Sequence, residues 1–123
     1  MQLLDNDWAR CEKYIESALK YAHDSHQLGD VRKSVEQGTA QFFPFEKSAM
    51  ITEIVDYPNK SVCRIWLAGG DLEELVEAEK KICDWARSHG CDGIEIIGRH
   101  GWKKVLKDYL PTSTVLVKDL KNE

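Results

Sequence analysis

The sequence predicts one α/β domain, in which a mixed, twisted sheet of about five strands is flanked by helices. The first observation lies at 62–70, where an apolar strand pattern runs through two glycines into a long helical pattern. That helix leads to a second apolar strand at 93–97, and a strand–helix–strand order of this kind makes the two strands parallel. The second observation is that three short strand patterns, separated by turn residues, come directly before the helix. They predict an antiparallel meander that continues into the parallel pair.

The length and composition of the chain suit a single soluble domain over residues 1–123. Hydrophobic residues make up 42% of the chain and charged residues 31%, which is ordinary for a globular protein. The net charge of −4 and the pI of about 5.6 argue against general affinity for nucleic acid or an anionic membrane, because binding phosphate needs a basic surface. We therefore expect neither nucleic acid nor membrane as a partner.

The start of the chain lacks the pattern of a signal peptide, and no apolar run approaches the length of a membrane span. The four cysteines show no C-x-x-C spacing, which favours free thiols in a cytoplasmic protein over a structural zinc site. These are Cys11, Cys63, Cys83 and Cys91.

In the first part of the chain, apolar residues at steps of three and four predict a helix that begins near Asp5 and ends at 23–26. His23 and His26 could share a metal, but a solvated helix end is the favoured interpretation, because no carboxylate or cysteine nearby completes a site. After a break at Leu28-Gly29, Asp30 is expected to cap a second helix over 31–37, which Gly38 ends.

The remaining elements follow the same kind of pattern. Strands are expected at 40–45, 49–57, 61–67, 94–97 and 114–117, and a short helix at 102–109. A long helix is expected at 71–89, with Glu79 as the one polar member of its apolar stripe and Gly90 as its stop.

This order resembles the GNAT (Gcn5-related N-acetyltransferase) fold without its usual first strand. The segments 30–42, 64–71 and 98–102 are similar to those of short GNAT-like proteins encoded by tailed phages and prophages. The resemblance implies a location in the host cytoplasm or in the virion. It also implies phage structural proteins as partners. The missing first strand leaves one edge of the sheet open, and a second copy of the chain could cover that edge.

GNAT enzymes bind acyl-CoA between two parting strands, with the pyrophosphate at the start of the long helix. The resemblance therefore implies that acetyl-CoA or CoA binds at the end of the strand and the first turn of the helix. The alternative, favoured by the adjacent glycines and by the acidic Asp71, Glu73 and Glu74, is a purely structural turn. The candidate cofactor-binding residues are Leu67, Ala68, Gly69, Gly70, Asp71 and Leu72.

Transfer of an acyl group to an amine needs a base, and a strand carboxylate can serve. Glu53 and Glu95 are the candidates, and for each the alternative is a place on the solvated face of its strand. The family resemblance implies a tyrosine acid in the last helix, where this chain has Lys107, so Tyr109 is the candidate two residues on. Arg99, His100 and Trp102 form a further cluster, either an anion site or a capped turn. No metal site is expected.

Two functions follow. One is an acyl-CoA-dependent N-acyltransferase with a degenerate cofactor loop. The other is a non-catalytic protein of the same fold that acts through protein–protein contacts in a phage particle or its assembly.

Overall fold

The structure is a computed structural model of the chain, and it describes residues 5–22, 25–97, 105–113 and 115–121. Within these residues the chain forms three helices and four strands. In order they are α1 (Asp5–Leu19), α2 (Leu28–Glu36), β1 (Gln41–Pro44), β2 (Ser48–Tyr57), β3 (Lys60–Gly70), α3 (Leu72–Ser88) and β4 (Gly93–Ile96).

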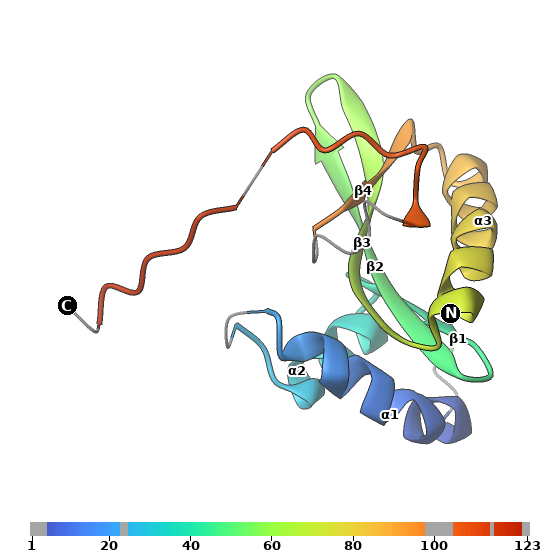
Figure 1. Cartoon of the computed structure of the whole chain (residues 1–123), viewed down its shortest axis with the longest axis vertical. Coiled ribbons are helices and arrows are strands. Elements are labelled where there is room, and N and C mark those ends of the chain that lie inside the picture. The colour runs from blue at the N-terminus through green and yellow to red at the C-terminus, as the bar shows by residue number, and fades with distance from the viewer. Residues whose placement is uncertain (1–4, 23–24, 98–104, 114, 122–123) are drawn as a thin grey trace.

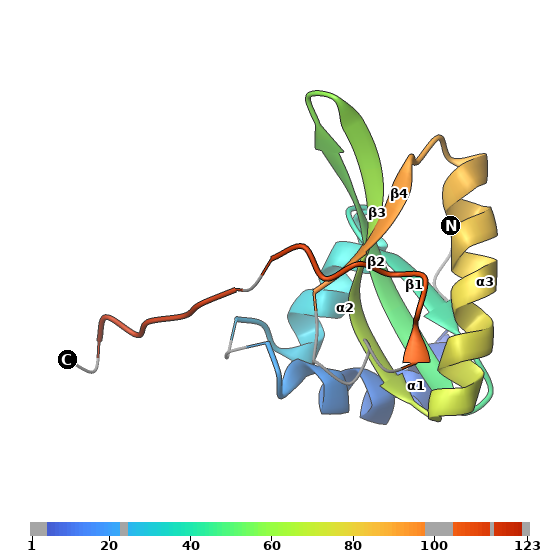
Figure 2. The same ribbon diagram turned by 45° about the horizontal axis from the view of Figure 1, so that its top comes forward.

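The four strands make one sheet in the order β1-β2-β3-β4. The first three strands are antiparallel neighbours, and β4 lies parallel to β3. Figures 1 and 2 show α1 and α2 on one face of the sheet and α3 on the other. The predicted meander, the parallel pair and the placement of helices on both faces are therefore confirmed.

Each face of the sheet has its own apolar core. On one face, Trp8, Cys11 and Ile15 of α1 pack with residues of α2 and of the sheet. On the other face, Leu75, Ala78, Ile82 and Ala86 of α3 pack on Met50, Cys63 and Ile65. Both helices place apolar residues three and four apart, so each buries one stripe against the strands and leaves its polar face to water.

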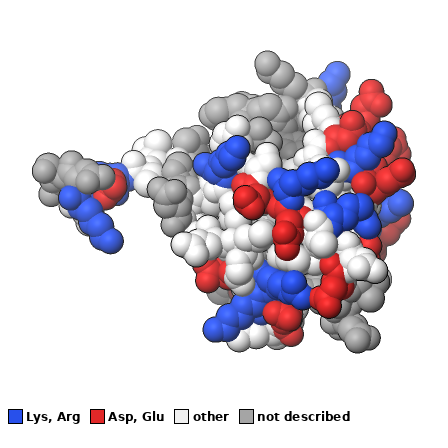
Figure 3. All heavy atoms as spheres, turned by 90° about the horizontal axis from the view of Figure 1, so that it is seen from below, with Lys and Arg blue, Asp and Glu red and all other residues white. Residues whose placement is uncertain are grey.

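The polar face of α1 carries both signs of charge. Seen from below in Figure 3, basic and acidic side chains are interspersed, and the charges do not gather by sign on this face. None of the described helices is long and apolar enough to cross a membrane.

The structure corrects the helix boundaries near the N-terminus. The first helix ends at Leu19 and not at 23–26. The second begins at Leu28, so Leu28-Gly29 lies inside it and is no break. Asp30 is the third residue of the helix and not its cap, and its carboxylate accepts a 2.9 Å hydrogen bond from the backbone N–H of Gln27, the residue before the helix. The predicted stop at Gly38 is confirmed by its positive φ of 82°.

The C-terminal part also differs from expectation. The predicted helix at 102–109 falls partly outside the described residues, and its last residues form a turn in which the Tyr109 N–H donates to the Leu106 carbonyl. Leu106 is buried and anchors this turn. The described residues 115–117 of the strand predicted at 114–117 do not form a strand: they are exposed and have no partner in the described sheet. The described sheet thus has four strands and not five.

Candidate functional site

The candidate site lies where β3 extends beyond the end of β4. The two strands pair from Val62 with Gly93 to Ile65 with Ile96, whereas β3 continues to Gly70. Beyond Ile65, the described part of the chain gives β3 no strand partner on the β4 side. The pairing between the two parallel strands therefore ends at this point.

A β-bulge marks the point of separation. Ile51 of β2 pairs with Leu67, and the next residue, Thr52, pairs with Ile65, so Trp66 has no opposite residue on β2. A bulge bends its strand and increases the local twist, which turns the end of β3 away from the line of β4. The resemblance placed an acyl group in a gap of this kind.

The two glycines at the end of β3 are explained by close packing. Both stay in the strand and pair with β2, so they do not form the turn that the sequence predicted. A Cβ on Gly69 would lie 2.1 Å from the carbonyl oxygen of Tyr14 in α1. A Cβ on Gly70 would lie 2.4 Å from the Lys47 carbonyl oxygen, and Gly70 also has a φ of 116°. The glycines thus let α1 and the β1–β2 turn approach β3.

The start of α3 is held by its own carboxylates. Asp71 is the N-cap, and its side chain accepts a 2.9 Å hydrogen bond from the Glu74 N–H. The Glu74 carboxylate in turn accepts from the Lys47 N–H at 2.8 Å and from the hydroxyl of the fully buried Ser48. The Asp71 N–H donates to the Lys47 carbonyl at 3.0 Å. The first turn of α3 is therefore tied to the β1–β2 turn.

These contacts do not fit the pyrophosphate of CoA. The Asp71 and Glu74 N–H groups are used inside the protein, and Asp71, Glu73 and Glu74 place three carboxylates around the helix start. The exposed Leu72 adds an apolar side chain there. A polyanion would have to displace the cap and to approach like charges.

Glu95 lies in a row that crosses the sheet, in which Glu53 of β2 is next to Arg64 of β3 and Arg64 is next to Glu95 of β4. Arg64 donates to Glu95 at 2.8 Å, and the Tyr57 hydroxyl donates to the same carboxylate at 3.1 Å. The oxygens of Glu95 are thus engaged by an arginine and a phenol. Its side chain is about one-third exposed, which makes the pair a partly solvated ion pair.

Glu53 lies on the sheet face opposite α3. Because side chains alternate along a strand, it shares this face with Ile51, which packs in the α1 core. Glu53 itself is only half-buried, so it is neither enclosed in the core nor fully solvated. Its role as a base stays a prediction.

Tyr109 is directed at α3. Its hydroxyl donates a 2.6 Å hydrogen bond to Glu79, which also accepts from the Cys83 thiol. Burial raises the pKa of Tyr109 well above its usual range, and the hydrogen bond to Glu79 adds to the shift. Glu79 is the polar member of the predicted apolar stripe of α3, and Tyr109 is its partner. The role of Tyr109 as a general acid likewise stays a prediction.

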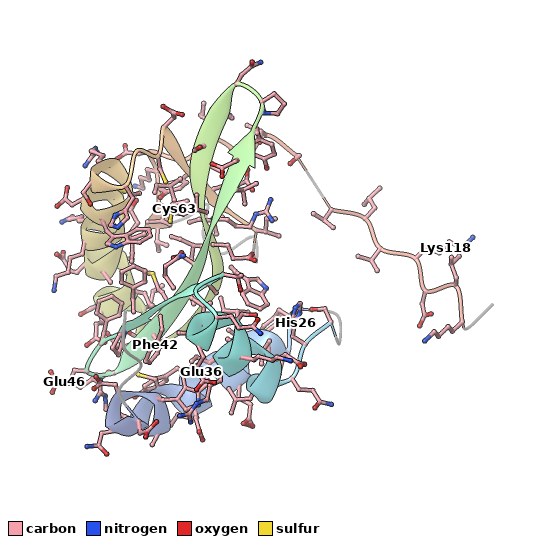
Figure 4. All side chains as sticks on the ribbon, turned by 180° about the vertical axis from the view of Figure 1, so that it is seen from behind. His26, Glu36, Phe42, Glu46, Cys63 and Lys118 are labelled. Atoms are coloured by element: carbon pink, nitrogen blue, oxygen red, sulfur yellow. The ribbon has the colours of Figure 1, made fainter. Side chains whose placement is uncertain are left out.

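His26 is a candidate that sequence reasoning set aside. Its ring lies 4.7 Å from the ring of Trp66, the bulge residue, at an interplanar angle of 70°. The Ser25 hydroxyl is 2.7 Å from its Nδ1 atom. Figure 4 shows His26 in the connection between α1 and α2, beside the sheet. No local sequence pattern could pair two residues so far apart, because the bulge and this connection bring them together.

The other predicted candidates are placed as follows. Arg99, His100 and Trp102, like His23, lie outside the described residues. Cys11, Cys63, Cys83 and Cys91 are free thiols. Within the described residues, no three His, Cys, Asp or Glu side chains are grouped as metal ligands would be.

Comparison of the sequence with protein-family models and with curated proteins finds no match. Comparison with solved structures finds several similar folds. The protein TTHA1254 of Thermus thermophilus has a TM-score of 0.65 at 14% identity, covering 98% of this chain and 95% of that one. A probable acetyltransferase has a TM-score of 0.67 at 8% identity, covering 97% of each chain. A possible acetyltransferase of Clostridium difficile 630 has a TM-score of 0.58 at 13% identity, covering 98% of this chain and 95% of that one.

At these identities the likeness concerns the fold alone. The antiparallel meander, the parallel β4 and the helix between β3 and β4 agree with the GNAT-like order that the sequence predicted. The chain therefore has a GNAT-like fold.

Proposed function

We propose that this protein is a non-catalytic member of its fold and acts through contacts with other proteins. The observation that supports this best is the start of α3, where the Asp71 side chain caps the helix and the Glu74 carboxylate is bound to the β1–β2 turn, at the place where GNAT enzymes bind the pyrophosphate of CoA. A shared fold does not determine activity, so similarity to acetyltransferases at below 25% identity is no evidence that this chain has their activity.

The physical reason lies in the unpaired N–H groups of a helix start, which can bind either a side chain or an anion. In this chain, the Asp71 side chain already binds the Glu74 N–H, and the Lys47 carbonyl binds the Asp71 N–H. Displacing Asp71 would cost about 1 kcal/mol for the lost cap. Each contact between a pyrophosphate and a surface carboxylate would cost a further amount on the order of 1 kcal/mol. A ligand that displaced the Glu74 carboxylate from Lys47 and Ser48 would leave the buried Ser48 hydroxyl without this hydrogen-bond acceptor.

Calorimetric titration of acetyl-CoA and of free CoA into the full chain at low salt tests this proposal. We expect no saturable heat up to millimolar ligand. Saturable binding at micromolar affinity would overturn the proposal if Leu72→Glu abolishes it. Leu72 suits this control because it is exposed beside the helix start, whereas Gly70 packs against Lys47 and any substitution there would disturb the fold. Binding that Leu72→Glu leaves unchanged would place the ligand elsewhere and leave the proposal standing for the start of α3.

A second candidate function is acyl transfer from acyl-CoA to an amine. The separation of β3 from β4 at a bulge favours it, because a separated pair of strands is where the resemblance places the acyl group. His26, beside Trp66 at that bulge, would be a third candidate for the base, besides Glu53 and Glu95. Release of a free thiol from acetyl-CoA in the presence of amines would detect the activity. If Glu53→Gln leaves such activity unchanged, Glu53 is not the base.

The setting that we propose is a tailed phage, with the protein in the host cytoplasm during assembly or in the particle. The likeness of segments 30–42, 64–71 and 98–102 to phage proteins supports this. Quantitative mass spectrometry of purified particles tests it. A constant copy number per particle would support a virion component, and loss of the protein on purification would restrict it to assembly.

A further inference from the structure

We propose that the outer edge of β1 binds an extended segment of a partner protein, which adds a strand to the sheet and directs a lysine or arginine at Glu36. The inference rests on the proposed function, because it names the surface and the kind of partner for a protein that acts through contacts with other proteins. None of the residues that carry it belongs to the start of α3.

The strand β1 is an edge strand, because among the described strands it pairs with β2 alone. The Phe45 N–H donates to the Ser48 carbonyl at 2.9 Å, and residues of an antiparallel strand direct their backbone groups alternately toward the partner strand and away from it. Phe43 therefore faces β2, whereas Phe42 and Pro44 direct their backbone groups outward. Since proline has no N–H, the outer edge offers the N–H of Phe42 and the carbonyls of both residues to an added strand.

A pocket of about 240 Å³ lies directly at this edge. It is lined by residues 35–38 at the end of α2 and by residues 40–42 at the start of β1. Figure 4 shows Glu36 at the end of α2 beside Phe42. The edge of β1 is thus next to a hollow that can take one side chain of the added strand.

The charge of this pocket is negative. Glu36 is the one ionisable residue among the described residues that line it, and its side chain is half-exposed. Its ion pair with the Nε atom of Arg32 is long, at 3.9 Å, and the guanidinium of Arg32 also binds Asp5. The C-terminal end of α2 adds the partial negative charge of its last carbonyl groups. A lysine or arginine of the partner is the side chain that this combination favours.

The other face of the same edge is aromatic. The ring centroid of Phe43 lies 5.3 Å from that of Trp85 in α3, and the two residues are half-buried. His89 stacks on Trp85, with 4.1 Å between the ring centroids. Side chains of a strand alternate between the two faces of the sheet, so the residues before and after the basic one would lie beside Phe43. We therefore expect the partner segment to carry a basic residue between apolar ones.

A second copy of the chain suits this edge less well than a different protein. Antiparallel pairing of β1 with its copy has a two-fold axis perpendicular to the sheet, so both α2 helices would lie on the same face of the joined sheet. The two copies of Glu36 and the negative ends of the two α2 helices would then lie close to each other, and like charges repel. A basic partner segment meets no such repulsion.

Selection of displayed random peptides on the immobilised full chain gives the first test. We expect enriched sequences in which Lys or Arg stands between apolar residues. Fluorescence polarisation of one enriched peptide, labelled with a fluorophore, then measures its affinity. Glu36→Lys should weaken this affinity by about tenfold or more, because it replaces an attraction by a repulsion. The matched control is Glu77→Lys, which should leave the affinity unchanged, since Glu77 is also an exposed glutamate paired within its helix, with Lys80.

Amide hydrogen exchange with and without the same peptide locates the contact. The Phe42 N–H should become protected when the peptide binds, and the Phe43 N–H, which faces β2, is the internal reference that is protected in both states. The proposal is overturned if no peptide is enriched, if the enriched peptides lack a basic residue, or if Glu36→Lys leaves the affinity unchanged. Protection of Phe42 that rises with the concentration of the chain alone would assign the edge to a second copy and would also overturn it.

The titration with CoA separates these outcomes from a failure of the proposed function. It reports on the start of α3, where Glu36 makes no contact. CoA binding there would overturn the non-catalytic assignment and leave the peptide result at β1 standing. Absence of both CoA binding and peptide binding would overturn the assignment of the β1 edge alone.

Discussion

Gly69 and Gly70 show how two identical neighbours can be required for different reasons. Gly69 is required by the approach of α1, whose Tyr14 carbonyl leaves no room for a methyl group. Gly70 is required by the β1–β2 turn and by its own positive φ. The sequence alone suggested a ligand loop as one explanation of the pair, because a local pattern contains no information about a helix more than fifty residues away. Tertiary packing decides between the two explanations.

Gly69→Ala should therefore lower the free energy of unfolding by about 2 kcal/mol or more, since overpacking a tight contact costs about 1–3 kcal/mol. The matched control is Gly29→Ala, where a Cβ would meet nothing within 4 Å. Gly29 lies in α2, so alanine there should be neutral or should stabilise by up to about 1 kcal/mol. Urea unfolding of both variants gives the comparison. Equal stabilities would show that α1 does not pack on Gly69 in solution.

A second residue-scale prediction concerns the buried thiol of Cys63. Burial raises its pKa to about 11, while its hydrogen bond with Thr52 works in the opposite direction. The folded protein then keeps the proton over a pH range in which the unfolded chain, with a thiol pKa near 8.5, has released it. Stability from this group is fully present below about pH 8.5 and is lost as the pH rises toward 11. The loss by pH 11 amounts to about 3 kcal/mol.

Urea unfolding of the wild type and of Cys63→Ala between pH 8 and pH 11 measures this effect. The variant is less stable throughout because it loses buried volume, but the difference from the wild type should narrow as the pH rises. Tyrosines and lysines titrate alike in both proteins and cancel. A constant difference across this range would contradict the raised pKa.

Among the elements, the join between α3 and the β1–β2 turn depends on Glu74. Its carboxylate holds the Lys47 N–H and the hydroxyl of Ser48, which is fully buried. Glu74→Ala would leave that hydroxyl without this partner, and an unsatisfied buried polar group costs about 1–3 kcal/mol. Glu73→Ala is the matched control, since Glu73 is exposed in the same turn. Its carboxylate stabilises the helix only through its interaction with the helix dipole, by about 0.3–1 kcal/mol.

Thermal unfolding of both variants should show the larger loss for Glu74→Ala. Near-UV circular dichroism should also change for that variant if the turn loosens. Equal effects would mean that the carboxylate acts only through the dipole, and a pyrophosphate could then displace it from this place more easily.

Elements could be predicted from sequence where the signal was local. Apolar periodicity located α1, α3 and β2. Gly38 and Gly90 located the ends of α2 and α3, and both have a positive φ in the structure. The register of the sheet, the bulge at Trp66 and the link from Glu74 to Ser48 could not be predicted, because each depends on residues distant in the chain. The strand at 114–117 was predicted wrongly for a related reason. Its composition is that of a strand, but a strand forms only with a partner.

The same limit applies to the candidate site. Its position at the end of β3 followed from the strand–glycine–helix pattern, and in the structure the pairing of β3 with β4 does end before that point. Its chemistry did not follow, because the place of His26 beside Trp66 and the engagement of Glu95 by Arg64 are tertiary facts.

At the scale of the whole molecule, one sheet separates two apolar cores. Ile15 is fully buried on the α1 side, and Ile82 is fully buried on the α3 side. Strand β2 supplies Ile51 to the first core and its neighbour Met50 to the second. Both helix layers therefore pack on the same strand, and loss of either layer would expose apolar side chains of that strand to water. The layers should therefore unfold as one cooperative unit, as small single domains usually do.

Ile15→Ala and Ile82→Ala test this cooperativity from the two sides. Each should lower the free energy of unfolding by about 2–5 kcal/mol, the usual cost of truncating a buried isoleucine. Ile54→Ala, at a position 37% exposed, is the control and should cost clearly less. Tryptophan fluorescence and far-UV circular dichroism should give coincident transitions for every variant, because Trp8 reports on the α1 layer and Trp85 on the α3 layer. If Ile82→Ala instead separates the two signals, α3 and β4 form a unit that can open alone.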